Sequence, residues 1–184
     1  MVIKTTFRSH YEVEIPAELP SSGLRVRYFP EVESRRGRLY EASLRFTYMG
    51  APSWWGVFAA RSKRGEGLDV VSSMPEPDAC CVIACGTGYV VDVREPDLWQ
   101  MVELYPILDV NAILDRQLLV LNDFARLLAY GVGGFRWRAE GQCSDQLKII
   151  RADSERITYT GWDAASDEEV TGHIDTKSGE RVPG

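Results

Sequence analysis

The chain has 184 residues, of which 45% are apolar, 26% charged and 10% aromatic. This composition excludes a disordered protein and is sufficient for one buried core, so we expect a single domain over residues 1–184. The formal net charge of −6 disfavours nucleic-acid binding, and no apolar run approaches the roughly 18–20 residues that cross a bilayer, so we expect a cytoplasmic protein.

Apolar and polar residues alternate in three segments of the first fifty residues, and this is the pattern of a half-exposed strand. Clusters of Gly, Pro and Ser, such as PAELPSSG, separate these segments and favour turns. We therefore predict an antiparallel meander at the start of the chain. The three segments are 10–15, 24–28 and 43–48.

Four further strands are predicted between residues 54 and 93, with the turn-forming stretches KRGEG, MPEPD and GTG between them. One of them, ACCVIAC at 79–85, is apolar on both faces, and this indicates a strand buried on both sides. We interpret its cysteines as reduced core side chains. A zinc site is disfavoured because no Cys-x-x-Cys pair is present and the two histidines, His10 and His173, are remote.

The segment REPDLWQMVELYP changes the pattern from strand to helix. Pro96 suits the first position of a helix, and the acidic Glu95 and Asp97 suit the positive end of its dipole. We predict one short helix near residues 96–105. The apolar positions that would form its buried stripe are Leu98, Met101 and Val102.

Residues 107–126 fit two structures, because their apolar residues can lie on one helical face or form buried strands. The sequence leaves this choice open. The next stretch, LLAYGVGGFRWRAE at 127–140, contains a Val-Gly-Gly turn of the kind that joins two strands. We predict a hairpin there.

Three segments share the order strand, short turn, strand, namely 89–101, 127–139 and 171–184, with Trp99 and Trp137 at matching places. Two of the stretches, LLAYGVGGFRWRAEG and HIDTKSGERV, resemble the hairpins of quinoprotein-type β-propeller repeats. The wider C-terminal pattern is also similar to a group of bacterial all-β proteins of uncharacterised function. These resemblances imply β structure and supply no catalytic residue.

A complete propeller of that type needs more blades than 184 residues can form. We therefore predict a mainly β fold, in which an antiparallel meander forms a sandwich or a partly closed sheet.

Trp54 and Trp55 provide the first candidate binding feature, because adjacent strand residues point to opposite faces of a sheet. If one face is open, one indole is exposed and forms an interaction hot spot. If loops cover both faces, both indoles are buried. Two basic loops could add a positive patch that attracts an acidic partner, or they could be ordinary solvated turns. The arginines that we add to the candidate partner-binding set are Arg35, Arg36, Arg61 and Arg64.

Motifs for catalysis and cofactor binding are missing from the sequence. No Gly-x-Ser-x-Gly elbow occurs, and GTGY at 86–89 lacks the third glycine of a dinucleotide site. The carboxylates of WDAASDEE, at 162–169, lie in one predicted loop, which we interpret as a solvated acidic loop, with a weak calcium site as the alternative. We expect no catalytic residue, metal or cofactor.

The function that fits these features is a non-catalytic protein-binding module, of an adaptor or immunity type, that binds a protein partner or a second copy of itself. The alternative is a carbohydrate-binding protein or glycoside-acting enzyme. In that case Trp54, Trp55 and Trp162 would stack on sugar rings, and the carboxylates at 163–169 would act on them.

Overall fold

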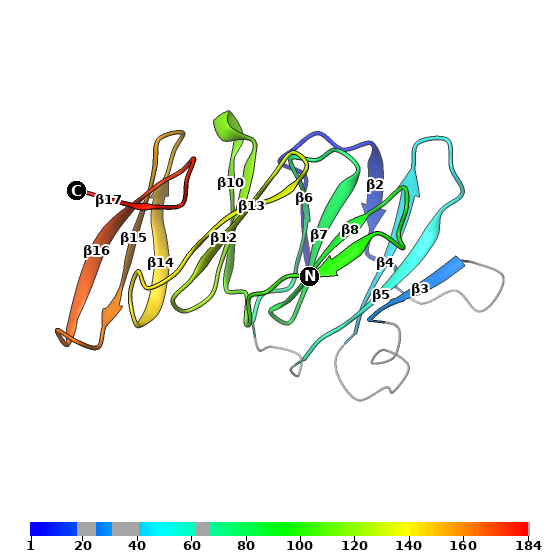
Figure 1. The fold of residues 1–184 in the computed structure, drawn as a ribbon. Coiled ribbons are helices and arrows are strands. Elements are labelled where there is room, and N and C mark those ends of the chain that lie inside the picture. Colours follow the sequence, from blue (N-terminus) through cyan, green and yellow to red (C-terminus); the bar gives the residue numbers. More distant parts are fainter. Residues whose placement is uncertain (18–24, 31–40, 62–66, 184) are drawn as a thin grey trace. The chain divides into compact units, whose positions relative to one another are not determined.

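The computed structural model describes residues 1–17, 25–30, 41–61 and 67–183 (Figure 1). The chain divides into two compact units, Met1–Tyr105 and Pro106–Gly184, which we call the N-terminal and C-terminal units. In the described parts of both, the regular structure is β-strand apart from a 3-10 turn, η1 (Leu114–Arg116). The predicted mainly β fold is confirmed. Across the same described residues, none of the helical structure is long and apolar enough to span a bilayer.

The first sheet of the N-terminal unit has the strand order β2–β4–β5–β3. Strand β4 is antiparallel to both of its neighbours, whereas β3 lies parallel to β5. A parallel pair cannot be closed by a tight hairpin turn, so β3 and β5 are brought together through the intervening strand β4. The strands are β2 (Tyr11–Glu14), β3 (Arg25–Phe29), β4 (Glu41–Tyr48) and β5 (Trp54–Ala59).

The second sheet of this unit has the order β1–β6–β7–β8–β9. Strands β6 to β9 form an antiparallel meander, and β1 joins its edge in parallel with β6. The strands are β1 (Val2–Lys4), β6 (Val70–Ser73), β7 (Ala79–Ala84), β8 (Thr87–Asp92) and β9 (Trp99–Met101).

Side chains of both sheets form one hydrophobic core, so the N-terminal unit is a sandwich. Strand β4 shows the expected alternation, with Ala42, Leu44 and Phe46 buried. Aromatic rings dominate the centre of this core. Phe46 stacks on Trp54 with ring centroids 4.5 Å apart, and such pairs add to the stabilisation that comes from burial alone.

The predicted helix near residues 96–105 is wrong. The carboxylate of Asp92 accepts hydrogen bonds from the backbone N–H groups of Arg94 and Glu95, each at 2.8 Å, and this closes a turn. Residues Trp99–Met101 then pair with β8 as strand β9. The acidic and proline residues that would begin a helix therefore form the turn of a hairpin instead.

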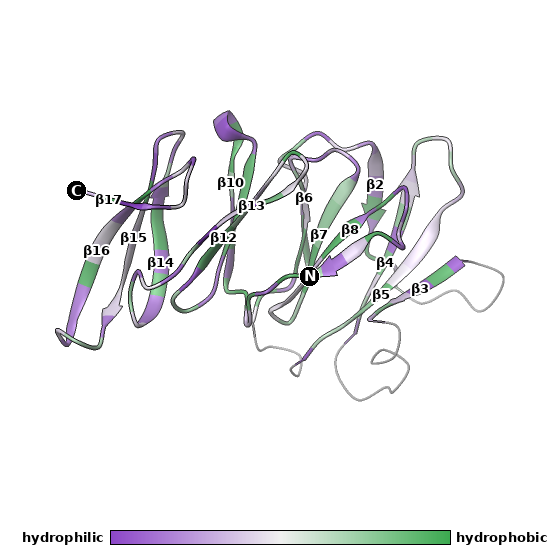
Figure 2. Ribbon diagram, viewed as in Figure 1, coloured by the Kyte–Doolittle hydropathy of each residue, from purple (hydrophilic) through white to green (hydrophobic). Residues whose placement is uncertain are grey.

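The C-terminal unit contains two four-stranded antiparallel meanders, each with its strands in chain order. Residues 107–126 form strands β10 and β11, joined by η1, and residues 127–140 form the predicted hairpin. Figure 2 shows hydrophobic residues over β12 and hydrophilic residues over η1. The strands are β10 (Asp109–Ile113), β11 (Leu118–Asn122), β12 (Leu127–Gly131), β13 (Gly134–Ala139), β14 (Asp145–Ala152), β15 (Arg156–Asp163), β16 (Glu168–Asp175) and β17 (Arg181–Val182).

One hydrophobic core joins the two sheets of the C-terminal unit, with Val120 and Trp137 from the first and Ile157, Tyr159 and Ile174 from the second. The three segments that share the order strand, turn, strand each form the last hairpin of a meander. These hairpins are β8–β9, β12–β13 and β16–β17.

Candidate functional site: a cleft lined by arginines

Trp54 is a core residue. It is 5% exposed, and its indole N–H donates a 2.9 Å hydrogen bond to the carbonyl oxygen of Val93, the residue that follows β8 of the other sheet. The indole thus links the two sheets.

Trp55 lies on the opposite face of β5 and is also buried, at 7% exposed. The alternative in which both faces are covered is therefore the one that the structure shows. The indole N–H of Trp55 has no hydrogen-bond partner among the described residues. The cross-strand neighbour Arg45 forms an ion pair with Glu14 at 3.0 Å. A surface patch built on the two indoles is not present.

Of the four predicted arginines, only Arg61 lies within the described residues; Arg35, Arg36 and Arg64 lie outside them. The guanidinium of Arg61 is 3.0 Å from the sulfur of Met101 and stands over the ring of Tyr105, 5.7 Å from its centroid. This arginine is exposed, and both of these contacts are to residues of the N-terminal unit.

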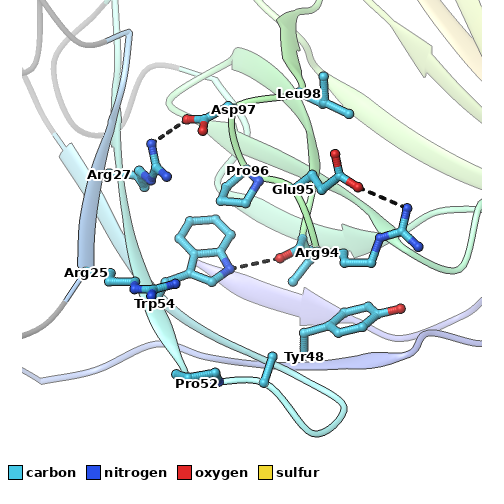
Figure 3. A pocket seen from close by; sticks show the side chains of 12 residues that line it. Arg25, Arg27, Tyr48, Pro52, Trp54, Arg94, Glu95, Pro96, Asp97 and Leu98 are labelled. Carbon is cyan, nitrogen blue, oxygen red and sulfur yellow. Dashed lines mark hydrogen bonds and ion pairs between the residues drawn. The ribbon is translucent and has the colours of Figure 1, made fainter.

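A cleft of about 350 Å³ opens beside Trp54, wholly within the N-terminal unit (Figure 3). One wall is strand β3, whose residues Arg25 and Arg27 lie on the same face as the buried Phe29. Register places Arg25 next to Trp54 and Arg27 next to Gly56 on β5. Both arginines therefore belong to the face that is turned toward the other sheet, at the end where the core opens to solvent.

The turn between β8 and β9 forms the facing wall of the cleft. Asp92 fixes this turn by accepting the N–H groups of Arg94 and Glu95, and its own N–H donates to the carbonyl of Leu98 at 3.0 Å. Pro96 lies at the centre of the turn, above the Trp54 indole (Figure 3). The turn is held by the Asp92 carboxylate and by backbone hydrogen bonds, so its outer side chains are available for other contacts.

Two ion pairs connect the charged side chains of the cleft. Arg27 pairs with Asp97 across it, and Arg94 pairs with Glu95 at 3.3 Å within the turn (Figure 3). The side chains of Arg27 and Asp97 are 43% and 76% exposed. Exposed pairs of this kind stabilise a protein by only about 0–1 kcal/mol. Arg25 has no ion-pair partner among the residues that the structure describes.

Tyr48 completes the rim of the cleft. Its hydroxyl donates to the carboxylate of Asp78 at 3.1 Å, and the same oxygen lies 2.8 Å from Nδ1 of His10. Desolvation, followed by the hydrogen bond to Asp78, raises the pKa of Tyr48. The phenol therefore stays protonated at neutral pH and acts as a donor.

The cleft has the chemistry of oxyanion binding. Guanidinium groups bind carboxylates and phosphates through paired N–H donors, and an indole with a proline provides an apolar floor. The thiol of Cys80 is unsuited to nucleophilic chemistry, because burial raises its pKa to about 12 and it remains protonated. No group of three metal-ligating side chains occurs in the described part of the chain.

The carboxylates at 163–169 serve local structure. Asp163 accepts the backbone N–H of Ala165 and the hydroxyl of Ser166, and these bonds lower its pKa. Glu168 and Glu169 are exposed at the start of β16. Trp162 is half-buried in β15. The acidic stretch is thus a turn stabilised by Asp163, followed by the exposed first residues of β16.

No protein-family model matches the chain, and neither does any curated protein. Of the cleft residues, sequence reasoning singled out Trp54 but missed the arginines of β3. Arg25 and Arg27 alternate with Val26 and Tyr28, a pattern that assigns the arginines to solvent, and only the burial of Phe29 on their face reveals that they border the core.

Proposed function

We propose that the protein is a non-catalytic protein-binding module whose arginine-lined cleft accepts an acidic segment of a partner protein. The observation that carries this proposal is the gathering of Arg25, Arg27 and Arg94 around one cavity, where they outnumber the carboxylates of Glu95 and Asp97, in a chain whose net charge is −6. A local positive site on an acidic protein attracts an acidic group without attracting nucleic acid in general.

The structure of the cleft also favours binding over chemistry. Its floor is Trp54, which the core holds in place through stacking and the hydrogen bond to Val93. A preorganised floor reduces the entropy that is lost when a partner segment binds. Its walls carry guanidinium groups that are permanently charged.

We further propose an adaptor or immunity-type role in the cytoplasm, since proteins of these types act by occupying a partner's surface. The carbohydrate-binding alternative loses two of its three stacking residues, since the indoles of Trp54 and Trp55 are buried.

The proposal can be tested by capturing partners from the native cell lysate with the tagged protein. We would compare wild type with the charge reversal Arg25→Glu/Arg27→Glu. The matched control is Lys148→Glu/Arg151→Glu, which changes the same charge on exposed positions of β14. Circular dichroism and thermal unfolding would verify that each variant is folded.

We expect a stoichiometric partner with wild type and with the β14 control, and at least tenfold less of it with the cleft variant. Equal capture by all three proteins would contradict the proposal. Glycan binding that shifts tryptophan fluorescence, without any protein partner, would support the carbohydrate alternative instead.

A further inference from the structure

We propose that the cleft binds a single oxyanion, a phosphate or carboxylate group, between Arg25 and Arg27, and that Asp97 holds the Arg27 side of this position in the free protein as a substitute ligand. This inference rests on the proposed function and specifies the chemical group of the partner that the cleft recognises.

The backbone of β3 brings the two arginines to one point. Arg25 and Arg27 are alternate residues of a strand, so their side chains leave the same face with Cα atoms roughly 6.6 Å apart. Both border the same cavity. Guanidinium groups at this spacing can donate to different oxygens of one phosphate or carboxylate, which is how paired arginines bind oxyanions.

Asp97 already shows which chemistry Arg27 accepts. Its carboxylate reaches across the cleft from the tip of the turn and pairs with Arg27 (Figure 3). The turn itself does not depend on this pair, because Asp92 and the backbone bonds of Leu98 hold it. Asp97 can therefore leave Arg27 without unfolding the turn.

An incoming phosphate has the advantage in this competition. The Arg27–Asp97 pair is largely exposed, and such pairs are weak. A phosphate monoester carries close to two negative charges at neutral pH and offers three acceptor oxygens. It can engage Arg25 and Arg27 together, whereas the Asp97 carboxylate pairs with Arg27 alone among the described residues.

The second ion pair leaves the proposed position free. Arg94 and Glu95 are neighbours in the turn and pair with each other on the other side of Pro96 from Arg27 (Figure 3). Their opposite charges cancel, and they do not occupy the gap between the two arginines of β3.

The test is a titration of the full chain with inorganic phosphate, followed through the side-chain Nε–Hε NMR signals of the arginines. We expect saturable shifts of the Arg25 and Arg27 signals. Asp97→Asn should tighten binding about twofold to fivefold, because it removes the competing carboxylate. Asp115→Asn, an exposed acid of the other unit, is the control and should leave affinity unchanged.

Two arginine variants complete the design. Arg27→Gln should abolish saturable binding, and Arg27→Lys should weaken it while keeping the charge, because lysine lacks the two-pronged donor geometry. Wild-type affinity in Arg27→Lys and Arg27→Gln, or Asp97→Asn binding no tighter than wild type, would overturn the inference.

Peptides distinguish the two sources of the oxyanion. A peptide with one phosphoserine, its glutamate version and its unmodified serine version would be titrated against wild type. Preference for phosphoserine identifies a phosphate ligand, and equal binding of the glutamate peptide identifies a carboxylate ligand. Equal binding of the serine peptide would contradict both.

Failure of the inference and failure of the proposed function remain separable. Partner capture that depends on Arg25 and Arg27, without phosphate or peptide binding, would retain the binding module and remove the oxyanion site. Phosphate binding without a protein partner would retain the site and remove the module.

Discussion

The two units of the chain contain the same structural device. In each, a tryptophan of one sheet donates its indole N–H to the carbonyl of the residue that follows a strand of the other sheet, Trp54 to Val93 and Trp137 to Thr176, both at 2.9 Å and both 39 residues apart in sequence. The accepting residue directly follows an aspartate that closes a hairpin turn. The device joins the two sheets of each sandwich through one side chain.

The turns that follow these aspartates differ. In the C-terminal unit, Asp175 closes a turn in which Gly179 lies against the Trp137 ring, so closely that an added Cβ would come within 2.7 Å of it. In the N-terminal unit the turn from Asp92 is one residue longer, carries Pro96 and Asp97, and leaves a cleft over Trp54. The same tryptophan-to-carbonyl hydrogen bond is thus followed by a closely packed turn in the C-terminal unit and by a charged turn beside a cleft in the N-terminal unit.

The largest expected effect comes from removing the tryptophans. Trp54→Ala and Trp137→Ala should each lower the free energy of unfolding by about 3–5 kcal/mol, because each deletes a large buried ring and a hydrogen bond between sheets. Urea unfolding, combined with amide hydrogen exchange in each unit, would measure the loss. A large cost in one unit and none in the other would break the comparison.

Phenylalanine substitutions isolate the hydrogen bond. Trp54→Phe and Trp137→Phe retain an aromatic ring but remove the N–H donor, so each should cost about 1 kcal/mol more than the lost ring area explains.

Gly179→Ala should be the next most damaging change. Gly179 has φ +76°, and a Cβ there meets the Trp137 ring at 2.7 Å. Gly50, with φ +70° and nothing within 4 Å of its added Cβ, is the matched control. We expect Gly179→Ala to cost about 1–3 kcal/mol beyond Gly50→Ala in urea unfolding, because only the former overpacks a core ring. Equal costs would show that the turn can move away from Trp137.

Low pH should lower the stability of the C-terminal unit, because aspartate carboxylates hold several of its turns. Backbone N–H donors lower the pKa of Asp153, Asp163 and Asp175 in the folded protein. An aspartate whose pKa is lower in the folded than in the unfolded protein stabilises the fold at any pH above its unfolded-state pKa of about 4. This stabilisation is lost as the pH falls from about 4 through the folded-state pKa. The triple variant Asp153→Asn/Asp163→Asn/Asp175→Asn should show a flatter stability profile as the pH falls below about 4. An unchanged slope would contradict this reason.

The smallest expected effect is in cysteine labelling, which reports on local unfolding of each unit separately. Cys80, Cys81 and Cys85 are buried in the N-terminal unit, whereas Cys143 is half-buried in the C-terminal unit. At pH 8 in native conditions we expect slow labelling of Cys143 alone, because burial raises the pKa of Cys80 and Cys81. Mass spectrometry at rising urea concentrations would then show whether the N-terminal thiols become reactive at the same midpoint as Cys143.

Strands were predictable wherever local alternation decides the structure. The pattern at 43–48 correctly placed Leu44 and Phe46 on the buried face of β4, and the Gly-Gly turn correctly indicated the β12–β13 hairpin. The helix near 96–105 failed because Pro, Glu and Asp favour both a helix start and a turn. The choice between them depends on Asp92 and on pairing with β8.

The candidate site was less predictable, because burial depends on what covers a strand. Alternation correctly puts Trp54 and Trp55 on opposite faces, yet nothing local says that both faces are covered. Likewise, Arg25 and Arg27 are read as solvent-facing from their neighbours. They border the cleft because parallel pairing with β5 puts Arg25 beside Trp54. This pairing joins β3 and β5, which are separated in the chain by the whole of β4.

The parallel pairing of β1 with β6 and of β3 with β5 also bears on how fast each unit can fold. Val2 must find Val70, and Arg25 must find Trp54, before the edges of the N-terminal sheets are complete. Every strand pair of the C-terminal unit joins neighbours in the chain. Non-local pairing slows folding because long loops must close before any contact compensates for the lost entropy. The C-terminal unit should therefore fold first, even though the N-terminal unit is the first to be synthesised.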